Sequence, residues 1–224
     1  MTPTPIRRAL ALLAGTVLLA ACGEDPAAPQ PDPNRGTDSF DTNTLASYAP
    51  YSDAAPAPSW AVAGGELVGT GVANQAVLVR TGASFVNGYV EATSVRADDG
   101  GLVLRFVSPT NYYLLAFRDD SAEAPRGQQN LALYHHDGMA YNQMWTADVS
   151  WARGTQHVIR LEASGNLLRV YFDGALKAEI TPGTAVNDPN PSVAAGGVGV
   201  RHFGFAPTWV TRVQSFTWHS YDTL

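Results

Sequence analysis

The sequence predicts an all-β domain in which two antiparallel sheets pack face to face. Short segments with strand-like composition recur along residues 38–224, and several of them alternate apolar and polar side chains. Turn sequences such as Asp137-Gly138 and Asp173-Gly174 separate these segments, and no segment of useful length has helical periodicity. About a dozen strands are too many for one flat sheet, so a two-sheet β-sandwich or jelly roll is expected.

Eight segments carry the clearest strand pattern. In one of them, Leu102, Leu104 and Phe106 are predicted to share one face of the sheet, because side chains alternate along a strand. Arg105 is then predicted to lie on the opposite face. The eight segments are Gln75–Thr81, Tyr89–Arg96, Leu102–Ser108, Tyr112–Arg118, Asn130–His135, His157–Ala163, Leu167–Phe172 and Val198–Phe203.

Composition and charge limit the classes of partner. The chain has 224 residues, of which 45% are hydrophobic and 15% charged, as in an ordinary globular protein. The formal net charge is −6, and it becomes −8 when residues 1–21 are removed, because they hold two arginines and no acid. No basic patch is visible, and nucleic acid is therefore excluded as an expected partner.

The N-terminus reads as an export signal that does not belong to the fold. Arg7 and Arg8 precede an apolar run, Ala9–Ala21, that is too short to span a bilayer as a helix. The run ends in Leu19-Ala20-Ala21-Cys22, which resembles the lipobox of bacterial lipoproteins. The resemblance implies that residues 1–21 are a signal peptide and that Cys22 is acylated. An ordinary secretory signal with an incidental cysteine is the alternative.

Residues 22–37 are expected to form the lipidated cysteine and a disordered linker. This stretch is rich in proline, small residues and charges, and it cannot bury apolar surface. Cys22 is the one cysteine of the chain, so the domain has no internal disulfide. Gly23 stands where an Asp commonly retains lipoproteins at the inner membrane. The resemblance therefore implies anchoring in the bacterial cell envelope, at the outer membrane or the cell surface.

The order of motifs from Asp38 to Leu224 resembles the concanavalin A-like lectin/glucanase superfamily, in particular its laminin G-like branch. It is also similar to the 3-keto-disaccharide hydrolase domain of secreted bacterial proteins. The motifs are Trp60-Ala61-Val62-Ala63-Gly64-Gly65-Glu66-Leu67, Gly88-Tyr89-Val90-Glu91-Ala92, Val170-Tyr171-Phe172-Asp173-Gly174 and Gly196-Gly197-Val198-Gly199. The resemblance implies a concanavalin A-like jelly roll, whereas function has to be argued from the site.

Catalytic motifs are missing from the sequence. Superfamily glucanases carry Glu-x-Asp-x-x-Glu, which places alternate carboxylates on one face of a strand. Here Glu91 is followed two places on by Thr93, and Glu162 by Ser164. There is no Gly-x-Ser-x-Gly motif, and the histidines lack metal-ligand spacing. No catalytic residue is predicted, and the domain is expected to lack glucanase chemistry.

A structural calcium is the metal hypothesis that the sequence supports. Asp38 and Asp41 stand at the start of the domain and Asp222 near its end. If the terminal strands pair, these oxygen ligands could come together. Solvated turn aspartates are the alternative interpretation. Further acidic clusters are Asp98, Asp99, Asp119 and Asp120.

Aromatic and planar polar side chains are the candidates for ligand binding, because sugars stack on aromatic rings and hydrogen-bond to polar groups. Trp151, before a Gly-Thr turn, is instead interpreted as a core residue. Four candidates lie on strands that resemble those crossing the family's concave sheet, and two lie in the segment Tyr134–Trp151. The six are Arg105, Tyr113, Arg118, His135, Trp145 and Arg201.

The sequence is thus interpreted as an envelope-anchored lipoprotein with a non-catalytic, carbohydrate-binding domain. The expected partners are the membrane, through the lipid, and a polysaccharide or other glycan. Two alternatives stay open. One is a glycoside-acting hydrolase of the 3-keto-disaccharide hydrolase type, and the other is a laminin G-like module that binds proteins.

Overall fold

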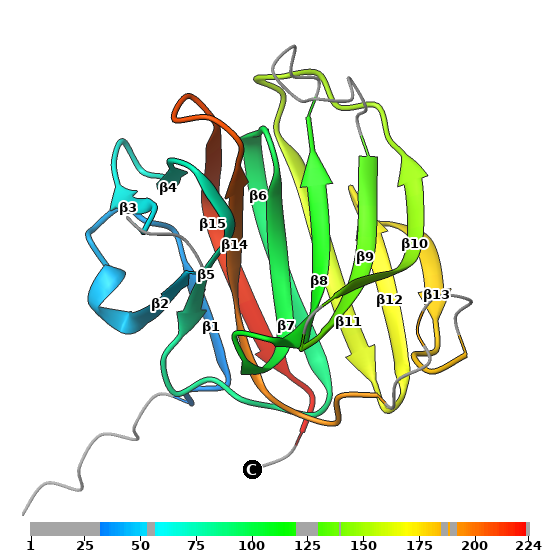
Figure 1. Cartoon of the computed structure of the whole chain (residues 1–224). Helices are drawn as coiled ribbons and strands as arrows, with labels where there is room; N and C mark the ends of the chain where they lie inside the picture. Colours follow the sequence, from blue (N-terminus) through cyan, green and yellow to red (C-terminus); the bar gives the residue numbers. More distant parts are fainter. Residues whose placement is uncertain are drawn as a thin grey trace, which may run out of the picture. The chain divides into compact units, whose positions relative to one another are not determined.

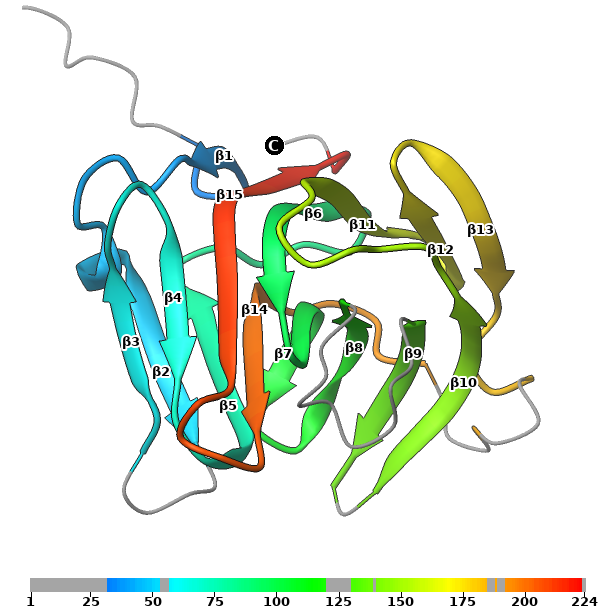
Figure 2. The same cartoon turned by 90° about the horizontal axis from the view of Figure 1, so that it is seen from above.

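Two antiparallel sheets face each other in the described part of the chain (Figures 1 and 2), and the predicted fold class is confirmed. The computed structural model describes residues 32–52, 57–119, 130–138, 140–184, 188 and 192–222. The predicted signal peptide, Cys22 and the first part of the predicted linker lie outside the described residues.

One sheet, called sheet A, has β15 near its centre, flanked by β6 on one side and by β4 and β1 on the other. All of its pairings are antiparallel. In spatial order its strands are β13 (Ala175–Ile180), β12 (Leu167–Phe172), β11 (His157–Ser164), β6 (Gly88–Ala97), β15 (Val210–Ser220), β4 (Leu67–Thr70) and β3 (Ser59–Val62), and β1 (Arg35–Asp38) pairs with β15.

The second sheet, called sheet B, carries the candidate site. Strands β7, β8 and β9 are neighbours both in the chain and in the sheet. Strand β14 lies between β7 and β5 and pairs with both. In spatial order its strands are β10 (Tyr141–Asp148), β9 (Asn130–Asp137), β8 (Asn111–Arg118), β7 (Gly100–Ser108), β14 (Gly197–Gly204), β5 (Ala73–Arg80) and β2 (Tyr48–Ser52).

Helical structure is minimal within the described ranges. The helical segment found there is a single 3₁₀ turn, η1, at Leu45–Ser47. No helix in these ranges has the length and apolar character needed to cross a membrane.

The eight segments with the clearest strand pattern all coincide with strands, namely β5 to β9, β11, β12 and β14.

The folded unit begins earlier than the sequence indicates. Arg35–Asp38 forms β1, which pairs with the last strand from Arg35 opposite His219 to Asp38 opposite Phe216. The Trp218 indole donates a hydrogen bond to the Pro33 carbonyl at 2.9 Å. The predicted domain start at residue 38 is therefore too late, because polar residues that look like linker form ladder hydrogen bonds at a sheet edge.

The main core lies between the two sheets. Sheet B contributes Leu104 and Leu115, and sheet A contributes Val90, Leu161 and Phe216, all fully buried. Core residues alternate with outward-facing ones along the strands, as the sequence predicts for Leu102 and Leu104. Their burial is the main source of stability in a domain with no internal disulfide.

Alternation fails at Arg105, where β7 has a bulge. Opposite β14, Leu104 pairs with Val198 and Phe106 with Gly197, so Arg105 is an extra residue in the ladder. Its φ is 53°, in the left-handed region that bulge residues adopt. Leu104 faces the main core while Phe106 packs in the cluster on the other face of sheet B. The prediction that both share one face is wrong for this reason.

The bulge brings the Arg105 side chain into a buried position among main-chain carbonyls. Nη1 donates to the Val193 carbonyl at 2.8 Å, Nε and Nη2 to Val86 at 3.1 and 2.7 Å, and Nη2 to Gly165 at 2.6 Å. Arg105 is 1% exposed. Burial lowers its pKa from the usual value. The guanidinium therefore ties together three loops that are far apart in the sequence.

The face of sheet B that points away from the main core, called the outer face, carries its own apolar cluster. Its buried members come from β5, β7 and β8, with Phe106, Tyr134 and Tyr141 packed against them. They are Val77, Val79, Val103, Tyr112, Leu114 and Ala116. Sheet B is therefore apolar on both faces, and polar side chains are few on its outer face.

Candidate functional site

A row of small residues forms a depression on the outer face of sheet B. Gly101 of β7 pairs with Ala116 of β8, which pairs with Ala132 of β9. Arg201 of β14 extends the same row, because it pairs with Gly101. A Cβ on Gly101 would lie 2.5 Å from Leu114 Cδ1 and 3.3 Å from Arg201 Cδ. Glycine at this position therefore leaves room for the Arg201 side chain.

The depression is a recess of about 180 Å³ with apolar, aromatic and charged walls. The floor is apolar, whereas the polar atoms belong to side chains at its border. The lining residues are Asp99, Leu114, Ala116, Arg118, Tyr134, Tyr141, Arg201 and Phe203.

Two arginines share one carboxylate at this recess. Arg118 Nε donates to Asp99 Oδ2 at 2.8 Å and its Nη2 lies 2.7 Å from the same oxygen, while Arg201 Nη1 donates to Asp99 Oδ1 at 2.5 Å. Asp99 and Arg201 are 3% and 6% exposed, and Arg118 is 22% exposed. Burial opposes the charge of Arg118, but the ion pair with Asp99 outweighs burial and raises its pKa. The three side chains together carry one positive charge.

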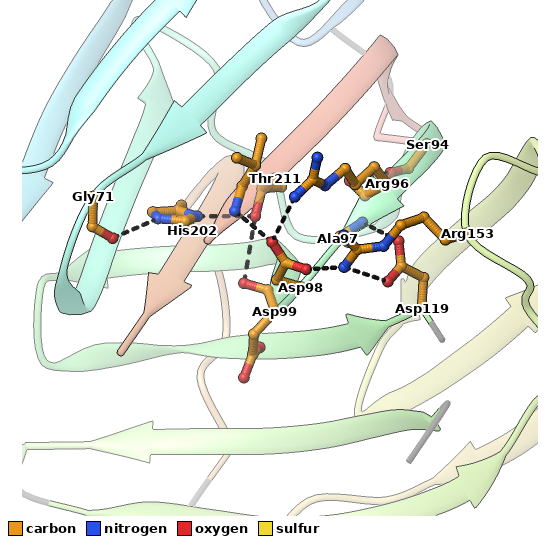
Figure 3. A network of polar contacts seen from close by, with 11 residues as sticks. Gly71, Ser94, Arg96, Ala97, Asp98, Asp99, Asp119, Arg153, His202 and Thr211 are labelled. Atoms are coloured by element: carbon orange, nitrogen blue, oxygen red, sulfur yellow. Dashed lines mark hydrogen bonds and ion pairs between the residues drawn. The ribbon is translucent and has the colours of Figure 1, made fainter. Parts of the chain in front are cut away.

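The connection between β6 and β7 holds Asp99 in place. The Asp99 carbonyl accepts a hydrogen bond from the Phe203 N–H at 3.0 Å, which ties the connection to β14. The preceding residue, Asp98, is fully buried, accepts the Val210 N–H at 2.7 Å and forms an ion pair with Arg153 (Figure 3). These contacts hold the main chain at Asp98 and Asp99, from which the Asp99 carboxylate reaches the two arginines.

Behind the site, His202 is buried on the opposite side of β14 from Arg201. Its Nε2 lies 3.1 Å from the Gly71 carbonyl and its Nδ1 3.0 Å from Thr211 Oγ1 (Figure 3). Burial lowers the pKa of His202. The ring is therefore neutral near neutral pH, with Nε2 donating to the carbonyl and Nδ1 accepting the hydroxyl proton. His202 adds no positive charge beside Arg201.

Aromatic side chains border the recess on two sides. The Phe203 ring lies against Arg201, whose Cζ is 4.7 Å from the ring centroid. Phe205 packs edge to face on Phe203 and is 61% exposed, which extends the aromatic surface outward from the recess. On the other side, Tyr134 and Tyr141 pack edge to face with centroids 5.9 Å apart. Such surfaces suit the apolar C–H face of a sugar ring.

Of the six predicted ligand-binding residues, the structure brings Arg118 and Arg201 together at this recess. Tyr113 and His135 lie on the core side of the sheet instead. The Tyr113 hydroxyl accepts the Val193 N–H at 2.9 Å, and burial raises its pKa to about 12. His135 is 2% exposed, with Nδ1 2.9 Å from Asp188 Oδ1. Both have the wrong parity along their strands for the outer face.

The other two predicted residues also lie away from the recess. Arg105 is occupied by main-chain carbonyls at its bulge, as described above. Trp145 is partly buried and packs against the main core. A register shift between Gln143 and Trp145 changes which residues of β10 face inward. Neither position could be assigned by counting alternate residues.

The structure does not assemble the predicted calcium ligands. The terminal strands do pair, but Asp38 lies opposite Phe216, six residues before Asp222, or about 20 Å along a strand. Asp222 instead accepts the N–H groups of Val86 and Asn87, which lower its pKa although burial opposes this. No group of three metal-ligating residues occurs within the described ranges. Calcium binding elsewhere stays a prediction.

The alternative acidic cluster is neutralised by arginines. Asp98 and Asp119 both contact Arg153, and Arg96 approaches Asp98 at 3.5 Å (Figure 3). Asp41 accepts a hydrogen bond from the Ser39 hydroxyl at 2.6 Å. Asp120 lies outside the described residues.

A second, wider recess of about 460 Å³ lies on sheet A, lined in part by Tyr171. Its charged side chains are matched to one another. Arg160 contacts Glu91 at 2.7 Å, and Asp173 lies 2.7 Å from the His157 ring. Because these charges are paired locally, the sheet A recess offers fewer unmatched groups to a ligand than the recess on sheet B.

Sequence reasoning missed three of the aromatic and acidic contributors to the site. Asp99 was grouped only with metal candidates, and Tyr134 and Phe203 were not singled out. A signal was present, because Tyr134 lies two residues from Ala132 and Phe203 two residues from Arg201. Residues two apart share a face. Whether that face points toward the main core or away from it, however, depends on how the sheet packs.

Comparison with known proteins gives structural likeness alone. No protein-family model matches the chain. No curated protein matches it either.

Three solved structures illustrate the likeness. The carbohydrate-binding module CBM66 from Bacillus subtilis is 13% identical with a TM-score of 0.55, over 78% of this chain and 93% of that one. A protein of unknown function with a galectin-like fold, also from B. subtilis, is 13% identical with a TM-score of 0.59, over 83% and 94%. A xylan β-1,4-xylosidase from Bacillus halodurans is 14% identical with a TM-score of 0.57, over 89% of this chain but 41% of that one.

The chain thus spans less than half of the xylosidase and nearly all of the other two proteins. Identities at this level bear on fold and leave activity open. The domain has the β-sandwich fold found in carbohydrate-binding modules and in parts of glycoside hydrolases.

Proposed function

We propose that this domain binds carbohydrate without catalysing its cleavage, through the recess on the outer face of sheet B. The observation that carries the proposal is the recess itself. It combines an apolar floor at Leu114 and Ala116, aromatic walls and two oriented guanidinium groups. These are the elements that a sugar ring requires, namely a flat apolar surface and directional hydrogen-bond donors.

The carboxylate at the recess is poorly suited to acid–base chemistry. Both oxygens of Asp99 accept hydrogen bonds from arginine side chains. These contacts occupy oxygen lone pairs that a general base would need for the proton it removes. Glycoside hydrolysis by the common routes needs two carboxyl groups flanking the bond, and among the lining residues that the structure describes Asp99 is the one carboxylate.

Glycan binding is tested by isothermal titration of the full-length protein with polysaccharides first identified on a glycan array. Phe203→Ala removes an aromatic wall and is expected to weaken binding about tenfold, the loss of a stacking contact. The matched control is Tyr171→Ala, which alters the recess on sheet A and should leave affinity unchanged. Equal losses in both variants would argue against a site on sheet B. Release of sugar product would contradict a non-catalytic role.

We also propose, from the sequence, that lipid on Cys22 holds the domain at the cell envelope. Intact-mass measurement of protein extracted from membranes is expected to show loss of residues 1–21 and addition of acyl chains. Two or more chains are needed for stable anchoring, since one holds a protein weakly. Cys22→Ser should give protein without acyl mass. A mature wild-type chain with a free Cys22 thiol would refute the anchor.

A further inference from the structure

The recess on sheet B has more hydrogen-bond donors than its own acceptors can satisfy. Each arginine carries five N–H groups, and the shared carboxylate Asp99 already accepts from both. Arg118 directs further N–H groups to the Asn130 side-chain oxygen at 3.4 Å, a long contact, and to the Tyr134 side chain. Arg201 Nε is buried and has no hydrogen-bond partner within the described residues. Since buried donors are normally paired, this one is an unmet requirement.

The recess also has an excess of positive charge in a desolvated setting. Two guanidinium groups face one carboxylate, and the Arg201 side chain is 6% exposed. The neighbouring His202 is neutral because burial lowers its pKa. Among the described lining residues, the remaining wall is apolar and aromatic and holds no second carboxylate. A bound anion would neutralise it.

A neutral sugar fits these groups less well than an acidic one. Sugar hydroxyls can accept hydrogen bonds from the guanidinium groups, but they carry no charge to offset the two arginines. Both oxygens of Asp99 already accept from an arginine. A carboxylate on the sugar accepts only, and it matches the planar guanidinium fork. The aromatic wall at Phe203 would meanwhile contact the ring.

We therefore propose that the ligand is a hexuronic acid residue of an acidic polysaccharide, with its carboxylate beside Arg201 and Arg118. This inference rests on the proposed function, because it assigns the sugar class to the same recess. It extends that function by predicting selection for C6 carboxylates over C6 hydroxymethyl groups. The domain's net negative charge gives no long-range attraction for such a polymer, so recognition is local.

The experiment uses an array of matched glycan pairs and the full-length protein. Each pair consists of a uronate oligosaccharide and its carboxyl-reduced neutral counterpart, for galacturonate, glucuronate and mannuronate. We expect the wild-type protein to bind the uronate member of one pair at least about tenfold more tightly, as charge-assisted hydrogen bonds allow. Raising NaCl from about 0.1 M to about 1 M, where the Debye length falls from about 10 Å to about 3 Å, should reduce that preference.

Two variants distinguish the contribution of the Arg201 charge from that of the Phe203 aromatic wall. Arg201→Gln leaves Asp99 paired with Arg118, and it should bring the affinity ratio of the pair close to one. Phe203→Ala should weaken both members by a similar factor and keep the ratio. Thermal melting of each variant confirms that it is folded. An unchanged ratio in folded Arg201→Gln would refute the proposed carboxylate contact.

The outcomes on the array distinguish the two proposals. Equal or tighter binding of the neutral members overturns the uronate inference and leaves glycan binding standing. Tighter binding of sulfated neutral glycans in the same array would show a general anion site instead of a uronate site. Binding of no glycan at all overturns both proposals.

Discussion

Replacing Arg105 with alanine is expected to lower the free energy of unfolding by about 3 kcal/mol. The guanidinium donates to the carbonyls of Val86, Gly165 and Val193, and each would be left without this partner. Val193 is buried, and its unsatisfied carbonyl would cost about 1–3 kcal/mol, whereas Val86 and Gly165 are exposed, so that water can replace the guanidinium there. The lost packing of the Arg105 side chain adds to this cost, and relief from burying the charge offsets part of it. Urea unfolding followed by tryptophan fluorescence measures the change.

Arg169→Ala is the matched control for Arg105→Ala. Arg169 forms an exposed pair with Glu179, and such pairs contribute little to stability. Its other partner, Glu162, is buried but keeps a hydrogen bond from the Tyr221 hydroxyl at 3.2 Å. Its unfolding midpoint should remain close to that of the wild type. If Arg105→Ala kept wild-type stability and instead lost glycan binding, the role inferred from the bulge would be wrong.

Trp151→Ala is expected to cost about 3–5 kcal/mol of unfolding free energy, because it leaves a large cavity in the main core. The indole is fully buried, with its ring centroid 5.7 Å from that of Phe117 and 6.1 Å from that of Phe172. Its Nε1 donates to the Thr155 carbonyl at 3.2 Å. The measurement is the shift in denaturant midpoint at constant slope.

Two further substitutions test the assignment of Trp151 to the core, one at Trp151 itself and one at the partly buried Trp145. Trp151→Phe keeps most of the ring and loses the hydrogen bond to Thr155, so its cost should be about 1 kcal/mol. Trp145→Ala removes a partly buried indole and should cost less than Trp151→Ala. The assignment of Trp151 to the core fails if Trp151→Ala melts within a degree or two of wild type.

Strand positions and the sandwich fold could be predicted because they depend on local patterns. Alternation in Leu167–Phe172 and the turn Asp173-Gly174 identify β12 and the hairpin that follows it. Where the ladder has a defect, as at Arg105, the same rule gives the wrong face. A one-residue bulge is nearly silent in sequence, yet it reverses the direction of the side chains that follow.

The candidate site was predicted only in part. Arg118 and Arg201 were recognised as polar groups on strands of the expected sheet. Their meeting on Asp99 was not, because the three residues belong to β8, β14 and the connection between β6 and β7. Nor does the sequence reveal that Gly101, Ala116 and Ala132 form one row.

The all-β class, most strands, the core role of Trp151 and the absence of the glucanase motif can be inferred from the amino-acid order alone. Those features follow from side-chain periodicity and local turn chemistry, which depend on neighbouring residues. Which arginines are structural and which border a recess depends instead on how the strands are arranged in the folded domain. Strand register joins residues distant in the chain, such as Gly101 and Arg201, and register is set by how the whole sheet packs.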